Sequence, residues 1–347
     1  MHTPPKFLFV TVNQRCNLRC QHCYFWQRND DDRPLYMSQP RLHEVMREFA
    51  DLNPAGNVVI CGGEPMLDLE IYFGITRQCL ALGLTGISVV NGTRIRTPEM
   101  ADRMIEEGPK EISISLNSQR PDLHDETRGV AGAFKKAVAA LRLLVEARKR
   151  NPSRDTKIYV MGLIFDRNYR EIDAFYDFVL NDIGADKLKL NFLQPAFGQP
   201  GDSDPFFSAH TRVDPGELGT ILKECDRKYG LGYNPEWLHQ VQMYFRSLNR
   251  IGDLDRGWAS DGRTEEHICN TYDRNIMVNE HGMARLCFST AFPGVQLEKY
   301  GDLRRFWEEA EAIRADMRQC NRYCGISHSV RRATTTAAAI DRTLPGR

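Results

Sequence analysis

The chain has 347 residues, of which 41% are hydrophobic and 27% are charged, and its 46 basic side chains equal its 46 acidic ones. This composition is typical of a globular protein, and the zero formal net charge favours neither nucleic acid nor an anionic membrane as a partner. No apolar run reaches the ~18 residues of a membrane-spanning helix, and the apolar stretch 7–12 is too short for a signal peptide. We therefore expect a cytoplasmic protein that binds neither nucleic acid nor membrane.

Short apolar runs alternate with longer amphipathic stretches between residues 6 and 193. The predicted strands are 6–13, 57–61, 86–90, 111–116, 157–165 and 187–192. The predicted helices between them are 39–52, 69–82, 98–107, 132–148 and 169–183. Six strand-then-helix units predict a parallel sheet with right-handed crossovers. We expect an α/β fold built as a partial (β/α)6 TIM-like barrel, with an open, doubly wound sheet as the alternative.

The sequence after residue 193 differs in composition, and the chain is expected to divide into four parts. Residues 275–288 have the pattern of a β-hairpin, and a helix is expected at 303–317. The predicted parts are a core (1–193), a connector and lid with helices (194–268), a small domain of hairpin and helix (269–326) and a tail (327–347).

Ten cysteines are unusual for such a chain, and seven of them gather near its two ends. Cys16, Cys20 and Cys23 follow the first predicted strand with spacings of three and two residues. Clustered cysteines in a long intracellular chain indicate metal ligands rather than disulfides. Three thiolates can hold three irons of a [4Fe–4S] cube and leave the fourth iron open. A structural zinc site is the alternative, although such sites usually close with a fourth Cys or His.

Polar motifs follow three consecutive predicted strands. They are Gly62-Gly63-Glu64-Pro65, Asn91-Gly92-Thr93 and Ser115-Leu116-Asn117. The carboxyl ends of parallel strands share one edge, where α/β folds place their ligand sites. Paired glycines let a ligand approach the backbone, and a carboxylate accepts hydrogen bonds from an ammonium group. We therefore expect these motifs and the three cysteines to form one site.

Together these motifs resemble the core of the radical S-adenosylmethionine (SAM) superfamily over residues 6–193. The segments that carry the resemblance are Cys16-x3-Cys20-x2-Cys23-Tyr24, Gly62–Pro65, Asn91-Gly92, Ile112–Leu116 and His124–Gly129. The resemblance implies that the amine and carboxylate of SAM bind the open iron of a [4Fe–4S] cluster. One electron then cleaves the S–C5′ bond, and the 5′-deoxyadenosyl radical removes a hydrogen atom from the substrate.

The resemblance also assigns roles to individual residues. Gly62, Gly63 and Glu64 would hold the methionyl amine. Ser115 and Arg128 would hold its carboxylate or the ribose. Tyr24 would flank the adenine, and Asn91 would lie at the ribose edge. The structural alternatives are a core aromatic for Tyr24, a turn for Asn91 and a surface ion pair for Arg128. Asn117-Ser118 departs from the usual Asp-Gly of the family, which puts the local polarity on the substrate side in doubt.

The C-terminal cysteines resemble the ligands of a twitch appendage, a shortened relative of the SPASM appendage. Their spacing satisfies a second [4Fe–4S] cluster completely, and a zinc ribbon is the alternative. These ligands are Cys269, Cys287, Cys320 and Cys324. Cys61 ends the second strand beside the paired glycines and is a weak catalytic candidate as a hydrogen-atom donor, with core packing as its alternative.

Two enzymatic functions fit this pattern. In the first, a dehydrogenase-type oxidoreductase oxidises or rearranges a carbohydrate- or aminocyclitol-like intermediate of natural product biosynthesis, with the auxiliary cluster accepting the electron. In the second, a peptide maturase makes a crosslink, thioether or epimer. The first core strand begins at Lys6, so the recognition module found in many such maturases is expected to be absent. A flavodoxin or ferredoxin is the expected reductant. A zinc-stabilised binding module is a distant third hypothesis.

Overall fold

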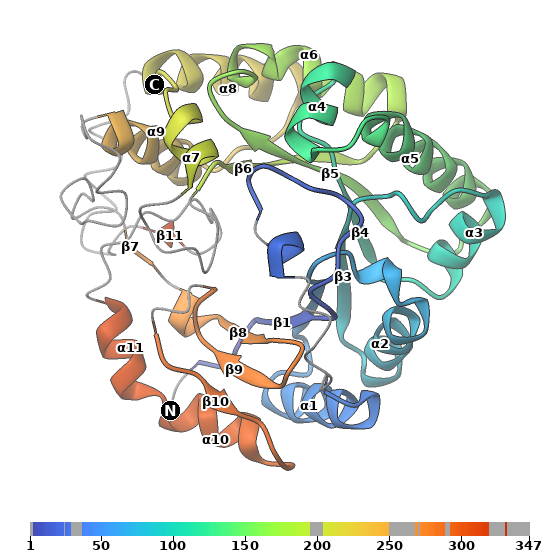
Figure 1. Cartoon of the computed structure of the whole chain (residues 1–347), viewed down its shortest axis with the longest axis vertical. Helices are drawn as coiled ribbons and strands as arrows, with labels where there is room; N and C mark the ends of the chain where they lie inside the picture. Colours follow the sequence, from blue (N-terminus) through green and yellow to red (C-terminus); the bar gives the residue numbers. More distant parts are fainter. Residues whose placement is uncertain are drawn as a thin grey trace.

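The strands of the computed structural model form an open ring with the helices on its outer side (Figure 1). The structure describes residues 3–23, 25–28, 37–194, 204–249, 268–269, 271–288, 292–318 and 330–331. Within these residues, one nine-stranded sheet has the order β10-β9-β8-β1-β2-β3-β4-β5-β6, and a second sheet pairs β11 with β7. The expected α/β partial barrel is confirmed.

The strands of the ring correspond closely to the apolar runs of the sequence. They are β1 (Phe7–Thr11), β2 (Asn57–Cys61), β3 (Thr85–Val90), β4 (Glu111–Ser115), β5 (Lys157–Ile164), β6 (Lys187–Phe192), β8 (Asn275–Val278), β9 (Met283–Arg285) and β10 (Val295–Gln296). Strands β1 to β6 pair in parallel with their neighbours. The small sheet consists of β7 (Ile268–Cys269) and β11 (Val330–Arg331).

Several helices begin at residues with clear capping roles. The described helices are α1 (Gln39–Leu52), α2 (Leu69–Leu82), α3 (Pro98–Glu106), α4 (Pro121–Arg128), α5 (Ala133–Arg150), α6 (Ile172–Asp177), α7 (Pro205–His210), α8 (Pro215–Tyr229), α9 (Pro235–Asn249), α10 (Asp302–Glu309) and α11 (Glu311–Arg318). The side chains of Ser38, Asp68 and Thr97 accept hydrogen bonds from the first turns of α1, α2 and α3. The described helices include none whose length and hydropathy would suit a bilayer crossing.

The C-terminal hairpin joins the main sheet, which the sequence did not indicate. Strand β8 pairs in parallel with β1, with Phe7 opposite Asn275 and Val10 opposite Val278. Strands β9 and β10 then extend the sheet in the antiparallel sense. The single helix expected at 303–317 is two helices, α10 and α11, separated at Ala310. The C-terminal ends of β1 and β8 therefore lie at the same edge of the ring.

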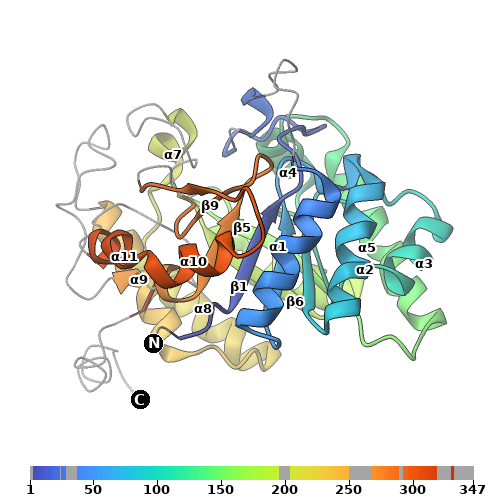
Figure 2. The same cartoon turned by 90° about the horizontal axis from the view of Figure 1, so that it is seen from below.

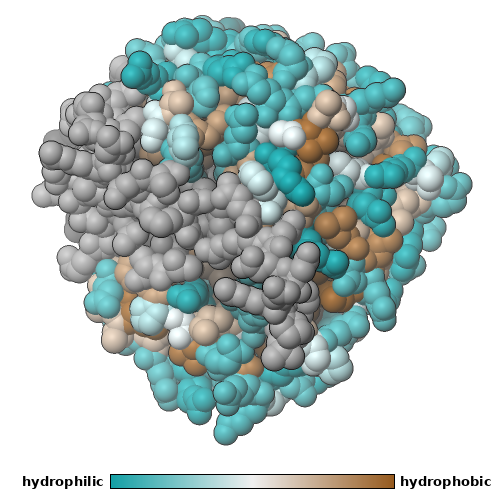
Figure 3. All heavy atoms as spheres, viewed as in Figure 1, coloured by the Kyte–Doolittle hydropathy of each residue, from teal (hydrophilic) through white to brown (hydrophobic). Residues whose placement is uncertain are grey.

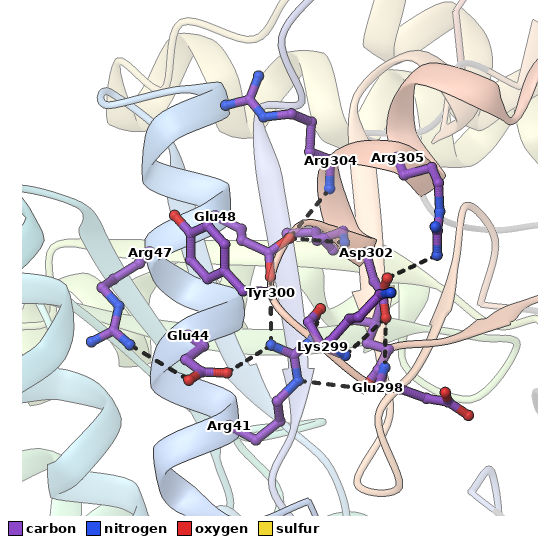
Figure 4. A network of polar contacts seen from close by, with 12 residues as sticks. Arg41, Glu44, Arg47, Glu48, Glu298, Lys299, Tyr300, Asp302, Arg304 and Arg305 are labelled. Carbon is purple, nitrogen blue, oxygen red and sulfur yellow. Dashed lines mark hydrogen bonds and ion pairs between the residues drawn. The ribbon is translucent and has the colours of Figure 1, made fainter.

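Helix α10 docks on helix α1 through a buried polar network (Figures 2 and 4). Gly301 precedes α10 and has no side chain to cap it. Instead, the buried carboxylate of Glu48 on α1 accepts hydrogen bonds from the Leu303 amide at 2.9 Å and the Arg304 amide at 3.5 Å. A carboxylate at a helix N-terminus satisfies free amides and opposes the positive end of the helix dipole. The core thus supplies a cap that α10 lacks.

A second contact in the same network comes from Arg41 on α1. Its Nη2 donates to the Lys299 carbonyl at 2.6 Å, and its Nε donates to the Leu297 carbonyl at 3.4 Å. Its Nη1 lies 2.9 Å from a Glu44 oxygen and 3.5 Å from a Glu48 oxygen. The C-terminal segment is therefore held on the core by main-chain contacts to charged groups.

Replacing Glu48 should loosen this docking. Glu48→Ala leaves two helix amides without their acceptor and removes one of the acceptors of Arg41, so we expect the free energy of unfolding to fall by about 2–4 kcal/mol. The matched control is Glu44→Ala on the same helix, which removes a half-exposed carboxylate and should cost under about 1 kcal/mol. Denaturant unfolding of both variants measures the difference. Equal losses for the two variants would contradict the capping role of Glu48.

The surface on the side seen in Figure 3 is mostly polar. Apolar residues appear there in small groups between hydrophilic ones, within the part of the chain that is coloured. The large hydrophobic side chains exposed among the described residues are Leu80, Val295 and Tyr300. They lie on separate elements, so they form no continuous apolar patch.

Candidate active site

Cys16, Cys20 and Cys23 lie in a loop directly after β1, and we call residues 13–23 the three-cysteine loop. On one side the loop accepts backbone hydrogen bonds from the residues after β2. Gly63 N donates to Asn13 O at 2.8 Å, and Glu64 N donates to Arg15 O at 2.7 Å. On the other side the loop donates to the end of α4, from Arg19 N to Arg128 O at 3.0 Å. The loop is thus fixed at the carboxyl edge of the sheet.

The two glycines after β2 are required by this loop. A Cβ at Gly63 would lie 2.1 Å from Arg15 O, and a Cβ at Gly62 would lie 2.6 Å from Asn13 O. Gly62 also has a φ of 140°, a conformation that L side chains rarely adopt. The sequence suggested that these glycines admit a ligand. The close approach visible in the structure is instead that of the loop backbone, which leaves the Gly62 and Gly63 carbonyls as the groups that a ligand could use.

Glu64 is a buried carboxylate beside the three-cysteine loop, with 1% of its surface exposed. It accepts hydrogen bonds from Asn91 N at 2.8 Å and Met66 N at 3.1 Å. Burial raises the pKa of Glu64 to about 7, although these amides and the nearby Arg128 partly oppose the shift. A carboxylate oxygen has two lone pairs, so both oxygens retain capacity for an ammonium donor.

Asn91 connects the end of β3 to the three-cysteine loop. Its Nδ2 donates to Asn17 Oδ1 at 2.9 Å, and its Oδ1 accepts from Thr93 N at 2.9 Å and Thr93 Oγ1 at 2.6 Å. Asn17 in turn donates to Thr93 Oγ1 at 2.7 Å. Asn91 therefore orients the loop as well as ending the strand, and one Nδ2 hydrogen remains for a ligand.

Arg128 ends α4 and is buried rather than part of a surface ion pair. Its Nη1 lies 3.7 Å from Cys20 Sγ, and its Nη2 donates to Asn117 Oδ1 at 3.0 Å. Its Nε has no hydrogen-bond partner in the structure. Ser115 lies at the carboxyl end of β4 and is half-buried. Arg128 thus places a positive charge next to a cysteine of the loop, with donor capacity to spare.

The cysteines of the loop are largely removed from water. Cys20 packs with Leu18 and Ala133, and Cys16 and Cys23 lie against this small cluster. Burial raises the pKa of Cys16 to about 11 and that of Cys23 to about 12. Among the described residues no three His, Cys, Asp or Glu side chains converge on one ion position.

The side chains of the ring strands alternate in burial. In β1, β3 and β5 half-buried residues alternate with fully buried ones. The buried set, such as Leu8 and Val10, belongs to the core under the helices, so the half-buried set faces the interior. Barrel interiors are normally packed by side chains. Thr11, Cys61 and Ser115 are half-buried at the carboxyl ends of their strands.

The sequence did not single out Glu280, which lies in the turn between β8 and β9. An acidic residue in a hairpin turn is normally expected to be exposed to solvent, but Glu280 is buried. It accepts a hydrogen bond from Gln14 Nε2 and lies 3.1 Å from His281 Nε2. Burial raises the pKa of Cys61 to about 12, and the charge of Glu280 adds to the shift. Glu280 thus connects the C-terminal hairpin to the three-cysteine loop.

The expected ligands of the second cluster are described only in part. Cys287 follows β9 and is half-buried, and the Cys269 backbone lies in β7, opposite Val330. Cys320, Cys324 and the predicted adenine neighbour Tyr24 lie outside the described residues. The chain after Cys287 turns toward the barrel, because the Phe288 ring lies 4.7 Å from the Phe9 ring of β1.

Comparison with known families decides what the edge of the sheet holds. Residues 10–179 match the radical SAM superfamily. The chain contains a radical SAM domain. Such a domain binds SAM and a [4Fe–4S] cluster, and three thiols in one loop beside the buried Glu64 carboxylate fit these two groups.

Relatives of the radical SAM domain have diverse functions. The chain is 25% identical over 224 residues to an AdoMet-dependent heme synthase of Methanosarcina barkeri, covering 64% of this chain and 58% of that protein. It is 29% identical over 192 residues to a pre-heme d1 synthase of Dinoroseobacter shibae, covering 55% and 44%. It is 24% identical over 194 residues to the antilisterial bacteriocin subtilosin biosynthesis protein AlbA of Bacillus subtilis, covering 55% and 40%. The chain thus spans about half the length of these relatives.

Solved structures share the fold of the radical SAM domain at low sequence identity. Streptococcus suis SuiB bound to precursor peptide SuiA superposes with a TM-score of 0.64 at 15% identity, covering 91% of this chain and 67% of that one. Native anSMEcpe with bound AdoMet and Cp18Cys peptide gives a TM-score of 0.60 at 15% identity, covering 91% and 83%. These likenesses extend the shared fold beyond the radical SAM domain itself.

The pKa of Glu64 predicts how SAM binding depends on pH. If the Glu64 carboxylate holds the methionyl ammonium, protonation of Glu64 opposes binding, so we expect SAM affinity to be about tenfold lower at pH 6 than at pH 8. Without SAM the sign reverses. Because burial favours the neutral acid, its contribution to folding stability is lost as the pH rises from 4.5 through about 7. Anaerobic calorimetry at several pH values measures the affinity. Glu64→Gln should bind weakly at every pH, and a pH dependence that persists in this variant would exclude Glu64 as its source.

Proposed function

We propose that this chain is a cytoplasmic radical SAM oxidoreductase that uses a second [4Fe–4S] cluster to oxidise or rearrange a small polar substrate. The substrate class is a carbohydrate- or aminocyclitol-like intermediate of natural product biosynthesis. The pairing of β8 with β1 carries this proposal, because it joins the hairpin that leads to Cys287 to the strand that leads to Cys16. Because β9 runs antiparallel to β8, Cys287 lies toward the Phe7 end of β1, whereas Cys16 follows the Thr11 end, and a substrate between them would lie between the two clusters.

When bound, the SAM and the cluster supply a 5′-deoxyadenosyl radical, which removes a hydrogen atom from the substrate. Cys16, Cys20 and Cys23 hold the cluster and leave one iron open. Gly62, Gly63 and Glu64 receive the methionyl ammonium through their carbonyls and the carboxylate, and Arg128 with Ser115 binds the methionyl carboxylate or the ribose. Asn91 and Tyr24 take the ribose edge and the adenine.

The second cluster belongs to residues 269–326, which we propose as a twitch-like domain. Its ligands are Cys269, Cys287, Cys320 and Cys324. The connector 194–268 would then form a wall of the substrate site, next to the core 1–193. A flavodoxin or ferredoxin would supply the electron for SAM cleavage. Cys61 lies at the edge of the interior and stays a candidate hydrogen-atom donor.

Polar side chains inside the barrel support a small polar substrate. Glu111 on β4 and Lys189 on β6 face the interior and form an ion pair at 3.1 Å, with both side chains about 30% exposed or less. Asn191 lies further along the same face of β6 and is half-buried. Hydroxyl-rich ligands need donors and acceptors of this kind.

A peptide substrate is the second candidate. The likeness to AlbA, a bacteriocin biosynthesis protein, and the shared fold with SuiB bound to its precursor peptide favour it. The maturase would then make a crosslink, thioether or epimer. Deuterium transfer into 5′-deoxyadenosine from labelled peptides and labelled aminocyclitols discriminates the two classes.

Anaerobic reconstitution tests the proposed function. With iron and sulfide the protein should bind roughly eight irons per chain, and with SAM and dithionite it should form 5′-deoxyadenosine. Cys16→Ala should retain roughly four irons and form no 5′-deoxyadenosine. A colourless protein that binds two zinc ions and does not cleave SAM would refute the proposal in favour of a binding module.

A further inference from the structure

Three segments form one continuous face around the three-cysteine loop. They are the loop itself, the connection 91–97 from β3 to α3, and residues 129–136, which lead from α4 into α5. Asn17 of the loop donates to Thr93 at 2.7 Å. Leu18 and Cys20 pack on Ala133 in the third segment. The face thus surrounds the loop on the outer side of the site.

All charged side chains in these three segments are basic. The segments contain no Asp or Glu, and their six Lys and Arg side chains are Arg15, Arg19, Arg94, Arg96, Lys135 and Lys136. Each of the six is exposed. Among the described residues none of them forms an ion pair, whereas basic side chains nearby do, such as Arg167 with Glu126. In a chain with zero formal net charge, this concentration makes a local positive field.

The described acidic residues next to this face either have partners of their own or lie on a neighbouring helix. Asp125 accepts from Gly132 N at 2.6 Å and Phe134 N at 2.7 Å, so it caps the start of α5. Glu126 pairs with Arg167. Glu99 lies in the first turn of α3 and is exposed. Among the described residues, the field of the six basic groups is therefore only weakly opposed from the adjoining elements; the acidic run Asp30–Asp32 lies outside the described residues.

The basic face contacts the proposed cluster ligands directly. Arg19 Nη1 donates to the Cys16 carbonyl at 2.9 Å, although Arg19 itself is exposed. Cys16 and Cys23 are half-buried, whereas Glu64 and Arg128 on the SAM side are buried. Cys16 and Cys23 are therefore partly accessible beside the basic face.

We propose that this face docks an acidic one-electron carrier protein of the flavodoxin or ferredoxin type. The proposal rests on the proposed function and assigns the surface at which its reductant binds. The carrier is oxidised by one electron and the cluster held by Cys16, Cys20 and Cys23 is reduced by one electron, with no bond or proton transferred. Opposite charges steer such encounters and set their salt dependence.

Charge reversal tests the docking face. The test variant is Arg96→Glu/Lys136→Glu, and the matched control is Lys6→Glu/Arg227→Glu, which changes two exposed basic residues outside the three segments. Lys6 precedes β1 and so lies at the opposite edge of the sheet. Binding of an acidic flavodoxin to the reconstituted enzyme is measured by surface plasmon resonance at two salt concentrations. We expect at least tenfold weaker binding for the test variant, less than twofold change for the control, and weaker wild-type binding in high salt.

The formation of 5′-deoxyadenosine separates this inference from the function on which it rests. With flavodoxin as reductant the test variant should lose at least tenfold in rate, and with dithionite it should match the wild type. No product from the wild type with dithionite would refute the proposed function. Product with dithionite, but flavodoxin binding that neither charge reversal nor salt changes, would overturn the docking face alone. So would tighter binding of single-stranded nucleic acid than of flavodoxin to this face.

Discussion

Gly63→Ala should abolish SAM cleavage, with a loss of at least about 100-fold in the formation of 5′-deoxyadenosine. The new Cβ would lie 2.1 Å from the Arg15 carbonyl oxygen. That oxygen belongs to the backbone, so no flexible side chain can rotate away to relieve the clash. Gly63 N donates to Asn13 O and Glu64 N donates to Arg15 O, so the three-cysteine loop cannot move away without losing both hydrogen bonds. The displaced loop carries the ligands of the cluster, so we expect iron content to fall as well.

Gly216→Ala is the matched control. Gly216 lies in the first turn of α8 without a left-handed φ, and the nearest atom to its Cβ would be Asp214 Oδ1 at 3.3 Å. This variant should keep its iron and its rate of SAM cleavage, because alanine is favoured over glycine in a helix. Iron analysis and single-turnover assays compare the two variants. Wild-type iron content and a wild-type rate of SAM cleavage in Gly63→Ala would show that the three-cysteine loop does not require glycine at position 63.

The sequence predicted the parts of the fold that local pattern determines. The bounds of α1 and α2 match the expected helices at both ends, and β2 and β6 match the expected strands. In each, apolar periodicity and capping residues such as Ser38 and Asp68 point to the same boundaries. The carboxyl edge of the sheet could be predicted as well, because parallel strands separated by helices place their ends together.

Long-range pairing could not be predicted in the same way. β8 pairs with β1 across more than 260 residues, as Phe7 opposite Asn275 shows, and no local pattern specifies such a partner. The short helices α4 and α7 were also missed. α4 begins at Pro121 without a side-chain cap, and its sequence reads as a polar loop, although Leu123 and Thr127 are buried. Their helical form depends on packing against the loop and the sheet.

The sequence indicated which residue types gather at the carboxyl edge of the sheet, but not the contacts between them. Glu64 was predicted to receive an ammonium group, but its burial and its two backbone donors appear only in the structure. Asn117, where the family usually has Asp, accepts from Arg128 and donates to Thr127, so the substitution is satisfied within the protein. Glu280 was missed because a hairpin turn gives no indication that a distant glutamine, Gln14, will cover its carboxylate.

Cys287→Ala should separate the two halves of the proposed reaction. Loss of one of four ligands removes the second cluster, so we expect roughly four irons per chain instead of roughly eight. SAM cleavage with dithionite should stay within a few-fold of the wild type, because the loop that holds Cys16, Cys20 and Cys23 is anchored by Gly63, Glu64 and α4 rather than by the C-terminal cysteines. Formation of oxidised product should fall at least about 100-fold, since the substrate radical loses its electron acceptor.

Cys225→Ala provides the control for Cys287→Ala, because Cys225 is buried in α8 among the apolar residues of the core. It should lose some stability but keep roughly eight irons. Iron analysis, electron paramagnetic resonance of the reduced protein and product assays distinguish the variants. If Cys287→Ala keeps all its iron, Cys287 is not a ligand of a second cluster. If it releases zinc instead, the C-terminal cysteines form a zinc ribbon. The substrate radical must then lose its electron by another route, or take a hydrogen atom back from 5′-deoxyadenosine without net oxidation.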